Sequence, residues 1–151
     1  MSKDSHEKPH HVMIVESRFY EEIAENLVNG AMAALEKAGS TYERFNVPGA
    51  LEIPAAVKLG SLRKNNPFDA YVALGCVIRG ETAHYDIVAG ESARGLMELS
   101  LIQDLPIGNG ILTCDTKDQA LMRSDPEQRN KGAAAVNAAM ALLKMKNNFG
   151  K

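Results

Sequence analysis

The stretch DAYVALGCVI (69–78) constrains the fold of this chain more than any other segment, because it is apolar at nearly every position. A strand with one face in water alternates apolar and polar side chains, whereas a central strand of a parallel sheet is covered on both faces. Such a sheet needs helices on both sides. The stretch therefore predicts an α/β fold built around this strand.

The rest of the chain fits this expectation. Further short apolar runs predict strands at 12–15, 42–47 and 107–114. Helical spacing of apolar residues, with capping and breaker residues, predicts helices at 20–38, 53–64, about 84–103, 117–123 and about 127–146. This order predicts one domain over 12–151, a three-layer sandwich whose middle layer is a parallel four-stranded sheet. Gly108 and Gly110 in the last strand are expected to let another backbone or a ligand come close.

Residues 1–11 are expected to form a flexible tail, because they are polar, contain Pro9 and show no periodicity. His6, His10 and His11 are predicted to be solvated, and they give no strong metal-binding pattern. The tail also lacks the apolar middle segment of a signal peptide.

Length and composition exclude several classes of protein. The 151 residues suit one domain, and a net charge of −2 gives no basic field to attract nucleic acid. No apolar run approaches the roughly 18 residues of a membrane span. Cys76 and Cys114 fit no zinc-binding spacing and are expected to be small buried hydrophobes. A reducing, cytoplasmic location therefore fits best.

A binding site is expected at the carboxyl edge of the sheet, where ligands bind to folds of this class. The four predicted strands deliver loops to that edge at 17–19, 47–52, 79–86 and 114–117. These loops also have the most unusual compositions in the chain, which supports a site independently of the topology.

The loop RGETAHYD (79–86) carries the strongest signal. Gly80 permits a tight turn or a close backbone approach, and Glu81 and Thr82 are expected to start a helix whose free N–H groups favour an anion. The Thr82 hydroxyl could donate to that anion or simply cap the helix. His84, which can exchange protons near neutral pH, is predicted to be catalytic and not merely solvated. The loop matches neither the Walker nor the Rossmann pattern.

Three other residues keep two roles open. Glu52 stands among apolar residues and needs polar partners, such as ligand hydroxyls, if it is buried. Phe19 could belong to the core or could stack on a flat ring. Arg123 could be solvated or could reach a phosphate with its planar donors.

Several stretches together resemble the lumazine synthase family. They follow the family's order and spacing over about residues 12–149: ESRFYEEI, VPGALEIPAA, ALGCVIRGETAHYDIV, GNGILT and RNKG. The resemblance implies a flavodoxin-like fold and the penultimate step of riboflavin biosynthesis. In that step 5-amino-6-(D-ribitylamino)uracil condenses with 3,4-dihydroxy-2-butanone 4-phosphate to 6,7-dimethyl-8-ribityllumazine. Water and inorganic phosphate are released, and no metal or organic cofactor takes part.

The resemblance also implies roles for individual residues. Phe19 stacks on the pyrimidine, His84 transfers protons, and Glu52 accepts from the ribityl hydroxyls. The other implied contacts are Ala50 and Leu51 for the ribityl chain, Cys76, Val77 and Ile78 for the pyrimidine edge, Glu81, Thr82 and Arg123 for the phosphate, and Lys131 as a basic residue near the site.

The resemblance further implies a homopentamer with sites between subunits, each with one wall from a neighbour's fourth strand. That wall position is Asn109 here. Asn109 and Leu51 both stand where many members carry an aromatic residue, which predicts a looser or more polar second face for the pyrimidine. The charged tail with Pro9 favours a free pentamer, or a small multiple of it, over an icosahedral shell. The lack of an insertion between Arg123 and Lys131 points the other way, so the shell stays open. Two alternatives stay open: a similar fold that binds a flavin or phosphorylated ligand without turnover, and a shell-forming protein without catalysis.

Overall fold

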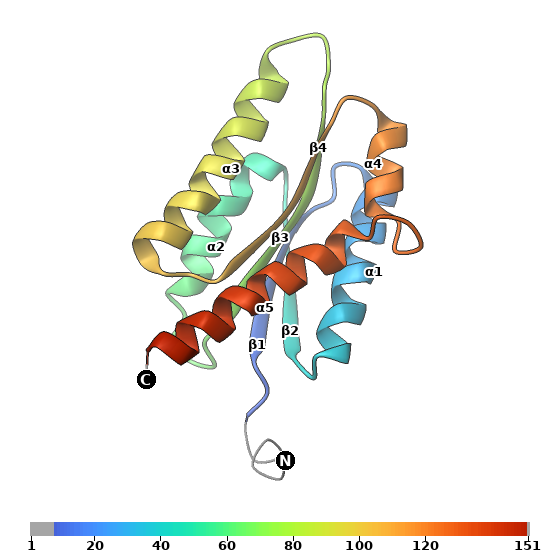
Figure 1. Ribbon diagram of the computed structural model, residues 1–151. Coiled ribbons are helices and arrows are strands. Elements are labelled where there is room, and N and C mark those ends of the chain that lie inside the picture. Colours follow the sequence, from blue (N-terminus) through green and yellow to red (C-terminus); the bar gives the residue numbers. More distant parts are fainter. Residues whose placement is uncertain (1–7, 151) are drawn as a thin grey trace.

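Four strands form one sheet in the order β2-β1-β3-β4 in a computed structural model that describes residues 8–150 (Figure 1). The strands are β1 (His11–Ser17), β2 (Thr41–Val47), β3 (Ala70–Ile78) and β4 (Ile107–Cys114). All three neighbouring pairs run parallel. Their carboxyl ends therefore meet at one edge of the sheet, at the top of Figure 1.

The helices form a layer on each face of the sheet, as predicted. Helices α1 (Glu21–Lys37), α4 (Lys117–Ser124) and α5 (Lys131–Phe149) share one apolar core with one face of the sheet. Helices α2 (Ile53–Ser61) and α3 (His84–Gln103) share a second core with the opposite face. The α/β sandwich and its parallel sheet are thus confirmed, with five helices around four strands in the part of the chain described.

Strand β1 shows how the sequence serves both cores at once. Successive strand residues point to opposite faces. Val12 and Ile14 accordingly pack in the core beneath α1 and α5, whereas Met13 and Val15 pack beneath α2 and α3. Strand β3 is likewise buried on both faces, which explains its continuous apolar run.

Gly108 brings helix α5 into direct contact with strand β4. A Cβ atom at this position would lie 1.8 Å from the carbonyl oxygen of Ala135, so no larger residue fits without moving the helix. The expectation that this glycine admits another backbone is therefore confirmed.

Helix α5 begins later than predicted. Asn130, with φ of 47°, lies in the left-handed region, and its backbone N–H donates to the carbonyl of Asp125 at 3.0 Å. Residues 125–130 therefore form a turn, and the helix runs over Lys131–Phe149 instead of 127–146. Helix α2 is also shorter than predicted and ends at Ser61.

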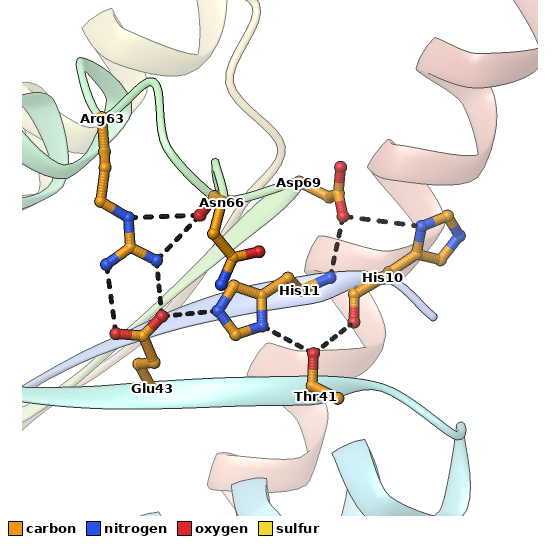
Figure 2. Close-up of polar contacts among 7 residues, drawn as sticks. All are labelled: His10, His11, Thr41, Glu43, Arg63, Asn66 and Asp69. Carbon is orange, nitrogen blue, oxygen red and sulfur yellow. Dashed lines mark hydrogen bonds and ion pairs between the residues drawn. The ribbon is translucent and has the colours of Figure 1, made fainter. Parts of the chain in front are cut away.

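His11 is not a solvated tail residue, contrary to expectation (Figure 2). It begins β1, and its side chain is only 14% exposed. Its ring nitrogens lie 2.6 Å from Thr41 Oγ1 and 2.6 Å from Glu43 Oε2, and the ring stacks on Phe68 at 5.3 Å. The partners come from β2 and from the segment before β3, so the sheet itself creates this contact.

The other histidines of the expected tail differ in what the structure says of them. His10 is exposed, with Nδ1 4.0 Å from a carboxylate oxygen of Asp69. His6 lies outside the described residues.

Across residues 8–150, none of the helices combines the length and apolar character required to cross a membrane.

Candidate active site

A cleft of about 400 Å³ opens at the carboxyl edge of the sheet, where a site was predicted. Three of the four expected loops line it, together with the first turns of α3. Its lining residues are Ser17, Phe19 and Tyr20 after β1, Pro48, Gly49, Ala50, Leu51 and Glu52 after β2, Cys76, Val77, Ile78, Gly80 and Thr82 at the end of β3, and His84, Tyr85 and Val88 in α3.

The aromatic ring of Phe19 stands at the mouth of this cleft. It is 74% exposed, so Phe19 does not belong to the core. Its ring meets the ring of Tyr20 edge-on, with 4.9 Å between centroids. An exposed ring beside a cleft is available to stack on a flat ligand.

The segment after β2 forms a short 3₁₀ turn, η2 (Ala50–Glu52), whose residues line the cleft. Ala50 is buried and Leu51 is 44% exposed. Glu52 is exposed, so its carboxylate needs no buried partner. One of its oxygens lies 3.3 Å from where a Cβ of Gly49 would stand, so the carboxylate folds back over the turn. Glu52 thus offers acceptor oxygens at the rim of the cleft.

The end of β3 supplies a largely apolar floor. Val77 is buried and Ile78 is half-buried. Cys76 is also half-buried, contrary to the expectation that it would be buried, because it lies where the strand reaches the cleft. Burial raises the pKa of the Cys76 thiol to about 12, so this thiol stays neutral at physiological pH. Burial also raises the pKa of Cys114, which is buried as predicted. A neutral thiol suits contact with an uncharged ligand and not nucleophilic attack.

The loop after β3 leads to His84, the first residue of α3. Glu81 and Thr82 precede the helix instead of forming its first turn, contrary to expectation. The backbone N–H of His84 donates to Thr82 Oγ1 at 3.3 Å, so the Thr82 hydroxyl supports the start of the helix. His84 is exposed and lines the cleft, where its imidazole can reach a ligand.

Arg79 connects this loop to the loop after β4. Its Nε donates to Asp115 Oδ1 at 2.9 Å, and its guanidinium lies 4.3 Å from the centre of the Tyr85 ring. The loop at 114–117 therefore supports a wall of the cleft without lining it.

Four predicted site residues do not line the cleft of the single chain: Glu81, Asn109, Arg123 and Lys131. Glu81 is exposed in the loop beside it. Asn109 is exposed on β4, where its Oδ1 accepts from the backbone of Ile111 at 2.9 Å. Arg123 is half-buried on α4, with Nη1 donating to the carbonyl of Gln119 at 3.2 Å, and Lys131 begins α5.

Several lining residues were not singled out from the sequence. Ser17, Tyr20, Tyr85 and Val88 belong to them, and all but Val88 lie in or directly beside the predicted site loops. Their loop positions were the available signal.

Within residues 8–150 no cluster of three or more His, Cys, Asp or Glu side chains could hold a metal ion.

Comparison with known proteins decides the family. The family model for 6,7-dimethyl-8-ribityllumazine synthase matches residues 9–147. The chain belongs to this family. Curated lumazine synthases match it over most of their length. The protein from Methylorubrum extorquens (strain PA1) is 55% identical over 138 residues, covering 89% of this chain and 80% of that protein. The protein from Bartonella tribocorum is 50% identical over 150 residues, covering 99% and 98% respectively.

Membership of the lumazine synthase family bears on the alternatives left open by the sequence. A similar relative, named 6,7-dimethyl-8-ribityllumazine synthase 1, occurs in Rhodopseudomonas palustris and is 50% identical over 143 residues. These matches favour an enzyme over a protein that only binds a flavin or only builds a shell. The lumazine synthase resemblance seen in the sequence is therefore confirmed.

Proposed function

We propose that the cleft is the active site in which this transferase condenses 5-amino-6-(D-ribitylamino)uracil with 3,4-dihydroxy-2-butanone 4-phosphate. The product is 6,7-dimethyl-8-ribityllumazine, in the penultimate step of riboflavin biosynthesis. One observation carries the assignment of the site: a single cleft holds an exposed ring, acceptor oxygens and an imidazole, from Phe19, Glu52 and His84.

The pyrimidine fits the part of the cleft between Phe19 and the end of β3. Phe19 offers a flat face for stacking. Backbone groups at Cys76, Val77 and Ile78 offer hydrogen bonds to the pyrimidine edge, since β3 ends there. The ribityl chain then extends toward Ala50, Leu51 and Glu52, and the Glu52 carboxylate accepts from its hydroxyls.

His84 is suited to the proton transfers of the condensation. The amine of the pyrimidine attacks the ketone carbon and loses a proton, and the former carbonyl oxygen leaves as water after it is protonated. An imidazole at the first residue of α3, which lines the cleft, can take and return such protons. The cleft also holds both substrates together, which lowers the barrier by proximity.

The phosphate of the ketone is placed by Glu81, Thr82 and Arg123. The first two lie directly before helix α3, where backbone N–H groups favour an anion. Arg123 does not line the cleft of its own chain. We infer that Arg123, Asn109 and Lys131 complete the cleft of a neighbouring subunit in a homopentamer. The exposed position of Asn109 on edge strand β4 supports this arrangement.

The function is tested by mixing the purified protein with both substrates and following the fluorescent lumazine. Phe19→Ala is expected to raise the KM for the pyrimidine severalfold, because it removes the stacking face. Phe149→Ala is the matched control, since Phe149 is 80% exposed at the end of α5 and does not line the cleft. Absence of product from the unaltered protein would refute the proposed activity.

The assembly is tested by light scattering and sedimentation at several protein concentrations. A pentamer supports the shared site, and an icosahedral shell would overturn the free pentamer. An active monomer would overturn the shared site itself.

The free thiols of Cys76 and Cys114 fit the reducing cytoplasm as the working compartment.

A further inference from the structure

Something other than side-chain packing must hold Phe19 over the cleft. Its ring is 74% exposed and meets the ring of Tyr20 in a T-shaped arrangement, and Tyr20 is itself only partly buried. An exposed ring of this kind is placed by the backbone that carries it. The relevant backbone is the turn at 17–20, between β1 and α1.

Arg18, the residue directly before Phe19, binds three carboxylates with three different nitrogens. Its Nη1 donates to Glu16 Oε1 at 2.6 Å, and its Nη2 donates to Glu25 Oε1 at 2.6 Å. Its Nε donates to Glu21 Oε1 at 3.2 Å. Glu16 belongs to β1, whereas Glu21 and Glu25 belong to α1. The guanidinium therefore ties both ends of the turn together.

Glu16 is a fixed anchor for this arrangement. Its side chain is 4% exposed, and it also accepts from Arg44 Nε at 2.8 Å. Burial acts to raise the pKa of the Glu16 carboxyl, but the hydrogen bonds from Arg44 and Arg18 outweigh it and lower that pKa below its ordinary value. The carboxylate is thus ionised, buried and paired from two sides.

The start of helix α1 has no side-chain cap of its own in the part of the chain that the structure describes. Tyr20 occupies the N-cap position, and within the described residues its side chain makes no capping hydrogen bond. Arg18 connects the first two turns of the helix to the strand instead. The planar fork of arginine suits this role, because lysine offers a single point charge.

We propose that Arg18 is a positioning residue that holds the turn at 17–20 so that Phe19 faces the pyrimidine. This inference rests on the proposed function, in which Phe19 stacks on the substrate. Arg18 itself does not line the cleft.

The test measures KM for each substrate separately by lumazine fluorescence. Arg18→Gln is expected to raise the KM for the pyrimidine about three- to tenfold, the effect of losing one aromatic stacking contact. The KM for the phosphorylated ketone should stay unchanged, and Arg18→Lys should restore the pyrimidine KM only in part. Arg44→Gln is the matched control, because it removes the other partner of Glu16 from strand β2 without touching the turn. Its KM values should equal those of the unaltered enzyme.

Phe19→Ala, measured alongside, separates the possible failures. If Phe19→Ala raises the pyrimidine KM but Arg18→Gln matches Arg44→Gln, the positioning role is overturned and the proposed function stands. If Phe19→Ala leaves that KM unchanged, the stacking role falls, and the role of Arg18 falls with it.

A second variant covers the case in which Arg18→Gln does not fold. Glu21→Gln combined with Glu25→Gln removes the helix side of the contact and keeps the buried pair of Arg18 and Glu16. Both glutamates are exposed, so the fold should tolerate the change. A raised pyrimidine KM in this variant supports the inference, and an unchanged one overturns it.

Discussion

Glu43→Gln should destabilise the protein at neutral pH without changing its active site. Glu43 accepts two hydrogen bonds from Arg63 and lies 2.6 Å from a ring nitrogen of His11 (Figure 2). The hydrogen bonds from Arg63 and then from His11 lower the pKa of its carboxyl from 4.5 to about 2. A change of this size corresponds to about 3 kcal/mol if fully expressed. Because the side chain is 36% exposed, solvent screening reduces the expected loss to about 1 kcal/mol.

The effect of Glu43→Gln should depend on pH with a definite sign. The pKa of the carboxyl is lower in the folded than in the unfolded protein, so its contribution is fully present above about pH 4.5. That contribution is lost as the pH falls through the folded value of about 2. The difference in unfolding free energy between the two proteins should therefore be constant near neutrality and should shrink as the pH falls below about 4.5.

Urea unfolding followed by circular dichroism measures this difference. The protein concentration must be fixed, because dissociation of an oligomer makes the midpoint depend on it. Glu127→Gln is the control, since it removes an exposed carboxylate far from this cluster in sequence. A loss that is equally large at pH 3 and pH 7 would refute the electrostatic explanation, as would no loss at pH 7.

Three further predictions concern catalysis. His84→Ala should slow turnover. A positioned acid or base contributes roughly 10²–10⁴-fold, and the loss is expected near or below the low end of that range because proximity alone accelerates this reaction. Unchanged turnover in the correctly assembled variant would remove His84 from the mechanism. Arg123→Ala should weaken binding of inorganic phosphate and of the phosphorylated ketone by roughly 1.5–3 kcal/mol, and it should leave binding of a pyrimidine analogue unchanged. If titration finds that the variant loses equal affinity for phosphate and for the pyrimidine analogue, Arg123 has a structural role instead. Activity should persist in a metal chelator, and a loss reversed by adding a divalent ion would contradict this.

The sheet was predictable because the apolar residues of its strands indicate directly which faces are buried. The run at 69–78 is apolar on both faces, and β3 occupies Ala70–Ile78 with helices on both sides. The start of α5 was not predictable in the same way. It depends on Asn130 adopting a left-handed conformation, and Asn is only one of several residues that tolerate it. The apolar spacing around that position fits a helix equally well.

The environment of His11 could not be predicted, because its partners are distant in sequence. Thr41 and Glu43 lie opposite the start of β1 only through the register in which His11 pairs with Thr41. A histidine that follows a mostly polar stretch resembles the end of a tail until the sheet is assembled.

The location of the site was predictable from topology, but the exposure of its side chains was not. Parallel strands bring their following loops to one edge, which is why the loops at 17–19, 47–52 and 79–86 meet. Whether Glu52 is buried or exposed depends on the turn at η2, and the sequence offers both readings. Tyr85 escaped notice because an aromatic residue in a helix is most often part of the core.

The amino end of the sheet contributes to the stability of the fold, and the carboxyl end carries the proposed binding site. At the amino end, Glu43 pairs with both His11 and Arg63 and links the strands there (Figure 2). At the carboxyl end, Phe19 and His84 are exposed and contribute little to the core, so their positions depend on contacts made by neighbouring residues. Changes at the amino end should therefore alter the unfolding free energy with little effect on KM. Changes in the contacts that support the cleft loops should alter KM. Those contacts determine where the exposed side chains of Phe19 and His84 lie, because core packing does not.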